Sequence, residues 1–394
     1  MGQNALEERR SPDPTFESLH WFPREAPSLP YTIGRKRVRF LQSSPPRPRR
    51  SGRNARRRGL RGHLFMIVLV TGAGGFLGGH LSEALAAAGC TVRAMVRPGR
   101  RAPLVADGTV ETVEADLLDE ASLRRVLRGC GGAVHAAART GYWSRSNAEQ
   151  WRVNVDGTTA FLRAAQAAKV GRIVFVSSIA TIGATREGTL LDERATWQGP
   201  NPRRIHYVLT KREAEQRALA AAWAGMKVVV VNPSMLIGPP VGATPPRGLI
   251  PAVATGKRTW VPPGGTSVAD VVDVARGTAV ALERGRSGER YILGGHNLTW
   301  LELQRAIRGL AGLTPPRRAL PAALFSLLTP AAALLDAVRL SRPPWAPELL
   351  RSFGWKAFVD SSRARDELAY ENRPLEESIR RTLAACAGGA GGAA

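Results

Sequence analysis

Cysteine is scarce in this chain, and its scarcity argues against a protein stabilised by disulfides or by a zinc ion. The sequence holds three cysteines, Cys90, Cys130 and Cys386, in 394 residues. An odd number without metal-ligand spacing gives neither a disulfide framework nor a zinc site, so we predict no bound metal. A reduced, cytoplasmic compartment is the simplest interpretation.

Uninterrupted apolar runs are also missing. The stretch 319–340 is apolar enough to raise the question of a membrane, but Pro321 and Pro330 break it and Asp336 interrupts it. No continuous spanning helix of about 20 residues therefore fits there. We expect an amphipathic helix over a pocket, with interfacial membrane contact as the less favoured alternative.

Acidic residues are outnumbered, with 32 Asp and Glu against 56 Lys and Arg. Residues 1–65 carry 15 Lys and Arg against 5 Asp and Glu, with proline clusters and no helical or strand periodicity. Such a segment cannot bury enough apolar surface to fold, so we predict that it is disordered. It is either a basic arm for nucleic acid or membrane, or the product of a start placed too far upstream of Met66. We favour the second interpretation and expect no nucleic-acid partner.

From residue 66 the chain has what the first segment lacks, an alternation of strands and helices that predicts parallel βαβ units. Strands are expected at 66–70, 91–96, 110–114, 133–138, 172–177 and 227–232, and helices at 76–89, 120–128, 148–169 and 205–223. We predict an α/β Rossmann fold, a doubly wound parallel sheet over 66–232 that is completed by about 266–295. A smaller, helix-rich substrate lobe is expected over 233–386, and a disordered Ala- and Gly-rich tail over 387–394.

A glycine-rich turn follows the first predicted strand, in the run Thr71-Gly72-Ala73-Gly74-Gly75-Phe76-Leu77-Gly78. Backbone N–H groups at such a strand–turn–helix junction cradle the pyrophosphate of a dinucleotide. Gly72 permits the tight turn, Gly75 lets the main chain approach the pyrophosphate, and Gly78 lets the helix pack on the sheet. Phe76 and Leu77, which begin the helix, complete this predicted cofactor site.

The end of the second predicted strand bears on cofactor choice, because an acidic residue there would bind the ribose 2′-OH. This chain has Arg97 at that place, with Arg100 close behind. A guanidinium group cannot accept hydrogen bonds but pairs well with a 2′-phosphate. We therefore predict NADP, with NAD as the alternative. Asp116 and Leu117, after the third strand, are placed to flank the adenine ring.

Tyr207 and Lys211 are four residues apart, so on a helix they share a face. An ammonium group beside a phenol favours phenolate and lowers the pKa of the phenol, which makes Tyr207 a usable general acid/base. Ser178 ends a strand-like run and would hold the substrate oxygen against Tyr207. Alone, such a Tyr–Lys pair is more often a chance spacing, but the dinucleotide turn upstream favours catalysis.

These features resemble, as a set, the extended short-chain dehydrogenase/reductase family. Within it the chain is similar to the NAD-dependent epimerase/dehydratase group and its dihydroflavonol 4-reductase-like and 3β-hydroxysteroid dehydrogenase-like branch, over about residues 66–383. The further motifs that carry the resemblance are His135-Ala136-Ala137, Asn154 in Arg-Val-Asn-Val-Asp-Gly-Thr, Ser177-Ser178 and Asn232-Pro233-Ser234.

The resemblance implies roles for individual residues. Ser178, Tyr207 and Lys211 would form the catalytic triad, and Asn154 would support the lysine through a proton-relay water. Ala136, Ala137, Pro233, Ser234, Tyr207 and Lys211 would also line the cofactor. His135 is expected to be structural.

The residues around Ser178 bear on the reaction. Related sugar dehydratases place carboxylates beside the active serine, whereas here Ile179-Ala180-Thr181 follows, which disfavours dehydration. A nucleotide-sugar epimerase would need contacts for a diphosphate, for which Arg247 and Arg276 are candidates, although solvated arginines are the simpler interpretation. Trp143, Trp197, Trp260 and the stretch 319–340 instead favour an apolar, polycyclic or terpenoid-like substrate.

We therefore predict an NAD(P)-dependent oxidoreductase that interconverts a secondary alcohol and a ketone of a small-molecule substrate by hydride transfer. A nucleotide-sugar epimerase on the same fold stays as one alternative. A non-catalytic dinucleotide-sensing regulator stays as another, although such proteins commonly lack the tyrosine and lysine found here. The sequence leaves a homodimer open.

Overall fold

The computed structural model describes residues 66–388, apart from 101–108, 143–146, 242–247, 257–259, 325–327, 329, 332–333 and 335–345. The chain divides into two units, Met1–Gly59 and Leu60–Ala394, and the described residues all lie in the second. The segment 1–65 and most of the predicted tail lie outside the described residues. The last helix, α12 (Leu375–Gly388), reaches two residues into that tail.

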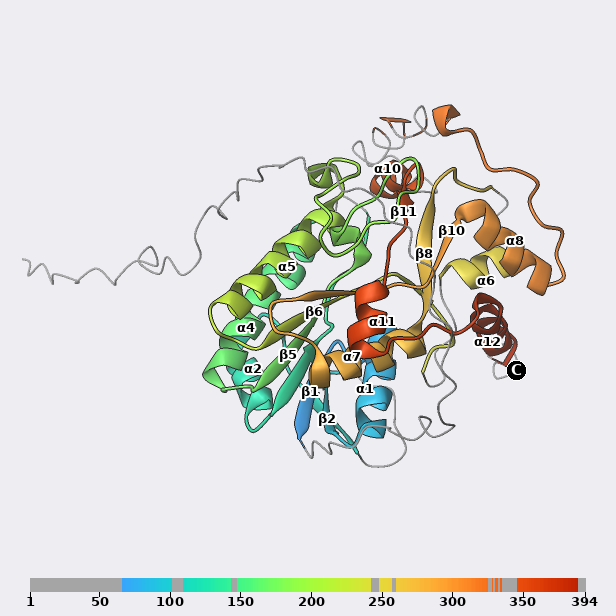
Figure 1. Cartoon of the computed structure of the whole chain (residues 1–394). Helices are drawn as coiled ribbons and strands as arrows, with labels where there is room; N and C mark the ends of the chain where they lie inside the picture. Colours follow the sequence, from blue (N-terminus) through green and yellow to red (C-terminus); the bar gives the residue numbers. More distant parts are fainter. Residues whose placement is uncertain are drawn as a thin grey trace, which may run out of the picture. The chain divides into compact units, whose positions relative to one another are not determined.

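The main sheet has seven parallel strands in the order β3-β2-β1-β4-β5-β6-β9 (Figure 1). Its strands are β1 (Ile67–Thr71), β2 (Thr91–Val96), β3 (Val110–Glu114), β4 (Gly132–His135), β5 (Arg172–Val176), β6 (Val228–Pro233) and β9 (Arg290–Leu293). The central strands are continuous apolar runs, such as Val228–Val231, because helices cover both of their faces. The doubly wound α/β fold predicted from the sequence is confirmed.

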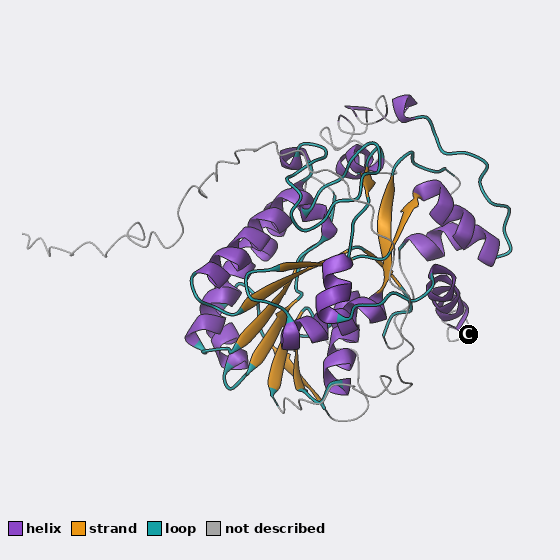
Figure 2. Cartoon of the chain, viewed as in Figure 1, coloured by secondary structure: helices purple, strands orange, loops and turns teal. Residues whose placement is uncertain are grey.

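Helices cover each face of this sheet (Figure 2). On one face lie α1 (Phe76–Ala87), α7 (Val271–Arg284) and α11 (Ser362–Leu368), and on the other α2 (Glu120–Leu127), α4 (Gly157–Ala167) and α5 (His206–Trp223). Two separate apolar cores result, one that includes Leu81 and Leu282 and one that includes Phe161 and Ala218. The two cores fix the strands rigidly, so that loops at their carboxyl ends are held in place.

The strand order reverses between β1 and β4, because β2 and β3 follow β1 in one direction and β4 begins the other. In open parallel sheets, ligands bind in the crevice at such a switch point, outside the carboxyl ends of the strands. The predicted glycine turn follows β1, and Ala136-Ala137 follows β4, so both stand at this crevice.

A second, smaller sheet was not predicted. It contains β7 (Met235–Ile237), β8 (Gly265–Asp270), β10 (His296–Thr299) and β11 (Lys356–Ala357), with β8 paired to the other three. Around it lie α6 (Leu249–Ala254), α8 (Trp300–Leu310), α10 (Pro347–Phe353) and α12. Residues 266–295 were expected to complete the Rossmann domain. Helix α7 and strand β9 of this segment do so, whereas β8 belongs to the second sheet. Its sequence, GTSVAD, lacks the apolar run of a central strand.

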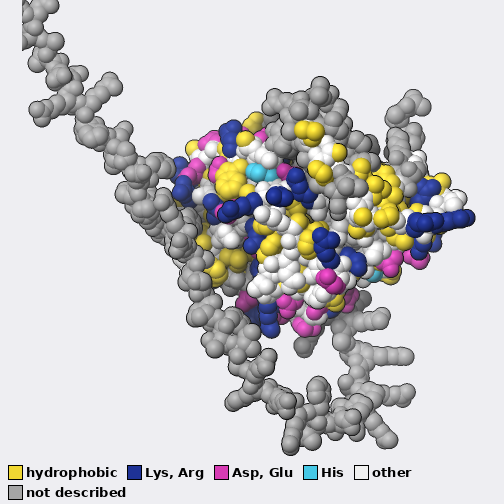
Figure 3. Space-filling model, turned by 90° about the horizontal axis from the view of Figure 1, so that it is seen from above, with side chains coloured by type: hydrophobic (Ala, Val, Ile, Leu, Met, Phe, Trp, Pro, Cys, Tyr) yellow, Lys and Arg dark blue, Asp and Glu magenta, His cyan; other side chains and the backbone are white. Residues whose placement is uncertain are grey.

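Charged side chains on the described surface are mixed in sign. On the face shown in Figure 3, Lys and Arg lie in separate groups with Asp and Glu near them, around patches of hydrophobic side chains. Several arginines are paired, for example Arg217 with Glu213 at 2.9 Å on α5. Among the described residues, no helix is both long and apolar enough to cross a membrane.

Candidate active site

The turn between β1 and α1 is shaped by two glycines. Gly72 has φ +73°, and a Cβ there would lie 2.8 Å from both Cα and N of Ala137 on the neighbouring β4 connection. A Cβ on Gly78 would overlap the Gly72 carbonyl oxygen, which itself accepts a hydrogen bond from Gly75 N at 2.9 Å. No side chain caps the start of α1, whose first residues are the exposed Phe76 and then Leu77. A backbone cradle with free helix amides fits the pyrophosphate of a dinucleotide.

The ends of β2 and β3 carry the other residues predicted to contact the cofactor. Arg97 and Arg100 are exposed, are joined by an Arg100 N to Arg97 O hydrogen bond of 3.0 Å, and form no ion pair with any described residue. The carboxylate of Glu114 contacts the segment between them, since its Oε1 accepts a hydrogen bond of 3.1 Å from the backbone N of Gly99, which lies between Arg97 and Arg100 in the sequence. Asp116 is exposed, whereas Leu117 is buried against Gly157.

The end of β4 is tied to the glycine turn through a buried histidine. Ala137 N donates to Thr71 Oγ1 at 3.1 Å, and the same hydroxyl lies 2.8 Å from His135 Nδ1. His135 Nε2 lies 3.1 Å from Thr158 Oγ1. Burial, with the nearby charge of Lys211, lowers the pKa of His135 to about 3, so the ring stays neutral. These contacts make His135 a structural link, and they place Ala136 and Ala137 beside Gly72.

Lys211 lies on α5 one turn after Tyr207 and is 4% exposed. Its Nζ donates to the Val176 carbonyl at 2.8 Å and lies 5.0 Å from the centre of the Phe175 ring. Burial lowers the pKa of Lys211 to about 8, although the carboxylate of Glu215 opposes this shift. The lysine is therefore positively charged at neutral pH and titrates just above it.

Tyr207 differs from the sequence expectation in one respect. Burial raises the pKa of its phenol above the ordinary value, and a hydrogen bond with the Ser178 side chain lowers it. Lys211 was expected to be the group that lowers this pKa, but its ammonium is bound to the Val176 carbonyl instead. A second phenol, Tyr142, lies with its ring centre 5.5 Å from that of Tyr207 and was missed from the sequence. The protein alone thus keeps Tyr207 protonated.

Ser178 caps a short 3₁₀ turn, η3 (Ile179–Thr181), through a hydrogen bond of 3.1 Å from Ala180 N to its Oγ. The buried carboxylate of Glu215 holds this turn in place by hydrogen bonds, a role that the sequence analysis did not predict. Glu215 accepts hydrogen bonds from Ser177 Oγ, Thr181 Oγ1, Asn232 Nδ2 and Arg290 Nη1. Glu215 follows Lys211 by one helical turn, so the same spacing argument could have found it.

Asn154 lies in a single π-helical turn, η2 (Arg152–Asp156), between α3 (Asn147–Trp151) and α4. The predicted helix 148–169 is therefore interrupted, and π turns of this kind often occur at functional sites. Asn154 Nδ2 donates to Thr210 Oγ1 at 3.1 Å and to the Arg139 carbonyl at 3.0 Å. Asn154 thus reaches α5 at the residue before Lys211.

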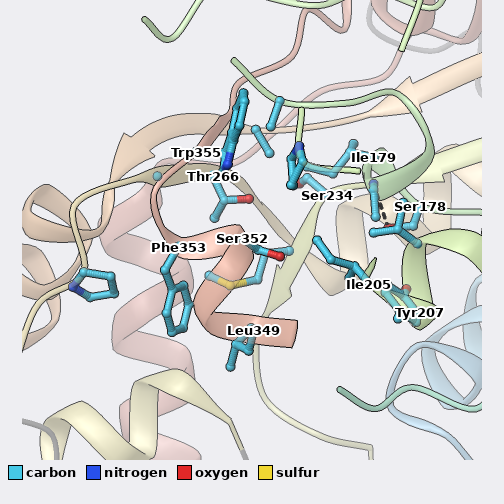
Figure 4. Close-up of a pocket in the computed structure, with 18 of the residues that line it drawn as sticks. Ser178, Ile179, Ile205, Tyr207, Ser234, Thr266, Leu349, Ser352, Phe353 and Trp355 are labelled. Atoms are coloured by element: carbon cyan, nitrogen blue, oxygen red, sulfur yellow. Dashed lines mark hydrogen bonds between the residues drawn. The ribbon is translucent and has the colours of Figure 1, made fainter. Parts of the chain in front are cut away.

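A cavity of about 410 Å³ opens beside Ser178 and Tyr207. Figure 4 shows these two residues at one side, with Leu349 and Phe353 of α10 across the cavity from them. The remaining wall is mostly apolar or aromatic, and none of the described residues that line the cavity is charged. Ser234, after β6 and its last residue Pro233, also lines it, and its buried Oγ has no partner among the described residues.

Of the tryptophans expected near the substrate, one lines the cavity, one packs on a cavity residue and one lies outside the described residues. Trp197 lines the cavity, and Trp260 packs edge-on against Phe353 at 5.8 Å between ring centres. Trp143, Arg247 and much of 319–340 lie outside the described residues. Arg276 is exposed on α7 and is not part of the described cavity wall. Residues of the cavity wall that the sequence did not reveal include Trp300, Gln304, Phe353 and Trp355.

Helix α10 is attached to the start of the helix that carries Tyr207. Glu348 Oε2 accepts a hydrogen bond of 2.8 Å from His206 N, the first residue of α5, whose own N-cap residue Ile205 provides no side-chain cap. Arg351 Nη1 donates to the Arg204 carbonyl at 3.0 Å. Helix α10 and the start of helix α5 therefore meet through a defined polar contact.

Comparison with known proteins agrees with this geometry. Residues 68–294 match the family described as "NAD dependent epimerase/dehydratase family". The chain is 34% identical, over 78% of its length and 92% of the relative, to "4-hydroxy-2-methyl-3-oxo-4-farnesyl-3,4-dihydroquinoline-1-oxide ketoreductase" of Stigmatella aurantiaca. It is 37% identical to the dihydroflavonol 4-reductase of Zea mays, over 48% of this chain and 57% of that one.

A solved structure is also similar, that of PA4631 from Pseudomonas aeruginosa, described as a nucleoside-diphosphate-sugar epimerase. Its TM-score is 0.67 and its identity 30%, over 82% of this chain and 98% of that one. The family match spans more than half of the chain. The chain therefore belongs to the NAD-dependent epimerase/dehydratase family, within the extended short-chain dehydrogenases/reductases, and is an NAD(P)-dependent oxidoreductase of its dihydroflavonol 4-reductase-like branch.

Proposed function

We propose that this protein interconverts a ketone and a secondary alcohol on an apolar small molecule, with NADP as cofactor and Tyr207 as the general acid/base. The observation that carries the proposal is that Tyr207 and Ser178 lie together at one side of a mostly apolar cavity whose described wall has no charged side chain (Figure 4). The bound nicotinamide would supply or accept the hydride at the reacting carbon.

The side chains divide the remaining work. In the direction of reduction, Ser178 and Tyr207 hold the carbonyl oxygen of the substrate, and the Tyr207 hydroxyl donates its proton to that oxygen. The raised pKa of Tyr207 suits a proton donor, because the phenol stays protonated near neutral pH. Lys211 lies one turn from Tyr207 on the same face of α5, and its positive charge would favour the phenolate that forms. Its Nζ is held in place by the Val176 carbonyl at the end of β5.

The preference for NADP rests on Arg97 and Arg100. Both are exposed directly after β2, and neither is engaged in an ion pair with a described residue. A 2′-phosphate at this place would gain two charge-assisted hydrogen-bond partners. The negative charge of Glu114, which accepts a hydrogen bond from Gly99 N, would weaken phosphate binding only in part. The glycine turn and the residues Asp116, Leu117, Ala136, Ala137, Pro233 and Ser234 would hold the rest of the dinucleotide.

The cavity wall supports an apolar substrate. A nucleotide sugar carries a diphosphate, which needs cationic or main-chain donors, and no charged side chain lines the described part of this cavity. The similar ketoreductase of Stigmatella aurantiaca is named for a farnesylated quinoline oxide, an apolar polycyclic ketone. Nucleotide-sugar epimerization is the second candidate, because the similar Pseudomonas aeruginosa protein is described by that activity.

A screen that follows NADPH absorbance tests the proposal. The purified protein is offered apolar ketones, aldehydes, steroids and nucleotide sugars, each with NADPH and with NADH. We expect consumption of NADPH with ketones, together with the matching alcohol as product. The proposal would be overturned if none of the ketones caused consumption of NADPH and the protein instead epimerized a nucleotide sugar.

A further inference from the structure

Two buried polar atoms on α8 lack hydrogen-bond partners among the described residues. They are Nε1 of Trp300, a donor, and Oε1 of Gln304, an acceptor. Buried polar groups are nearly always paired, so two exceptions on one helix need an explanation. The two residues are one turn apart and therefore share a face of α8.

Neighbouring contacts fix both side chains in place. Gln304 is 2% exposed, and its Nε2 donates to the Trp260 carbonyl at 3.2 Å, so its amide oxygen is the atom left free. The Trp300 ring packs edge-on against Phe353 with 5.6 Å between centres. Trp300 also begins a helix that is capped by Thr299 and Glu302, which act as a capping box.

Both residues line the same cavity as Ser178 and Tyr207. They come from the substrate lobe, whereas Tyr207 lies on α5, and Figure 1 places α8 and α5 on opposite sides of β8. The cavity therefore has a reacting end at Tyr207 and a second end, the α8 wall, defined by Trp300 and Gln304. Between them the wall is mostly apolar or aromatic.

We propose that the α8 wall binds a hydroxyl group of the substrate, remote from the carbon that reacts. A hydroxyl oxygen can accept a hydrogen bond from Trp300 Nε1 while its proton is donated to Gln304 Oε1, so one group satisfies both atoms. The substrate is then an apolar ketone with a second, hydroxylated end, or the diol formed from it. This inference rests on the proposed function for the reacting end only.

A matched pair of rigid ketones tests the α8 wall. Dihydrotestosterone is a tetracyclic ketone with a hydroxyl at the far end, and androstanone is the same ketone without it. We expect the full chain with NADP⁺, which has no hydride to give to a ketone, to bind dihydrotestosterone about tenfold more tightly than androstanone by calorimetry, because the analogue leaves both protein atoms unpaired. Equal affinity for the two ketones, as a bound water at the α8 wall would give, or binding of neither, overturns the inference.

Variants locate the effect. Gln304→Met and Trp300→Phe each remove one polar atom and keep an apolar side chain, so each should bring the ratio of the two affinities from about ten to close to one. Gln166→Met, an exposed position on α4, makes the same chemical change elsewhere and should alter neither affinity. Equal losses for both ketones in the α8 variants would show a packing role and refute the inference.

This inference can be tested separately from the proposed function, because binding is measured with NADP⁺, without reduction of the ketone, and reduction is then measured with NADPH. A protein that prefers the hydroxylated ketone but reduces neither ketone would contradict the proposed reaction and uphold the α8 wall. A protein that reduces both ketones without preference would uphold the reaction and refute the α8 wall.

Discussion

Glu215 lies one helical turn after Lys211 on α5, and its carboxylate opposes the burial that lowers the pKa of the lysine to about 8. The same carboxylate accepts hydrogen bonds from Ser177 and Thr181, on either side of Ser178. One buried group therefore supports both the charge of Lys211 and the position of Ser178.

The titration of Lys211 predicts a pH dependence for ketone reduction. Below about pH 8 the lysine is protonated and favours the Tyr207 phenolate that forms, and above it the charge is lost. We expect kcat/KM with NADPH to fall as pH rises through about 8. The measurement is a pH profile of initial rates, and a flat profile up to pH 10 would show that this charge is not needed.

Replacing the carboxylate should move that profile. Glu215→Gln removes the group that raises the pKa of Lys211, so the fall in kcat/KM should begin at lower pH than in the unaltered protein. Glu213→Gln, two residues earlier and paired with Arg217 on the outer surface, is the matched control and should leave the profile in place. If the pH profile of Glu215→Gln is unchanged, Glu215 has a structural role only and does not set the pKa of Lys211.

The contact between Glu348 and His206 predicts a coupling between helices α10 and α5. Glu348→Gln weakens the cap of α5, and we expect a loss of about 1 kcal/mol in the free energy of unfolding. KM for the ketone should rise because Leu349 and Phe353 of α10 line the cavity, while NADPH affinity stays unchanged. Glu376→Gln, exposed on α12, serves as control; an equal rise in the NADPH Kd would argue against a local effect.

Cofactor preference should respond to Arg97. Arg97→Asp replaces a partner of the 2′-phosphate with an acceptor for ribose hydroxyls, so the ratio of kcat/KM with NADPH to that with NADH should fall at least about tenfold. Arg163→Asp, an exposed arginine on α4, makes the same charge change away from the site. If both variants keep the original ratio, Arg97 does not read the phosphate.

The nucleotide-binding half could be predicted from the sequence because its signals are local. The run before Gly72 is a buried strand, and every strand expected between 66 and 232 occurs within three residues of its predicted ends. Tyr207 and Lys211 share a helix face as their spacing predicts. The interruption of the helix at Asn154 was not foreseen, because a π turn has no clear sequence pattern.

The part of the chain after residue 233 could not be predicted in the same way, because its contacts join residues far apart in the sequence. Nothing local links Glu348 to His206, and β11 is two residues long, too short to give an alternating pattern. The electrostatics of Tyr207 also depended on the fold, since only the structure shows that Lys211 is bound to the Val176 carbonyl.

The most direct test is Tyr207→Phe, measured in a single turnover with NADPH and a ketone that the unaltered protein reduces. The change removes one hydroxyl and keeps the ring against Tyr142, so NADPH should bind with nearly unchanged Kd. We predict that reduction slows by about a hundredfold or more, because the carbonyl oxygen loses its proton donor. Reduction at the original rate would contradict the account.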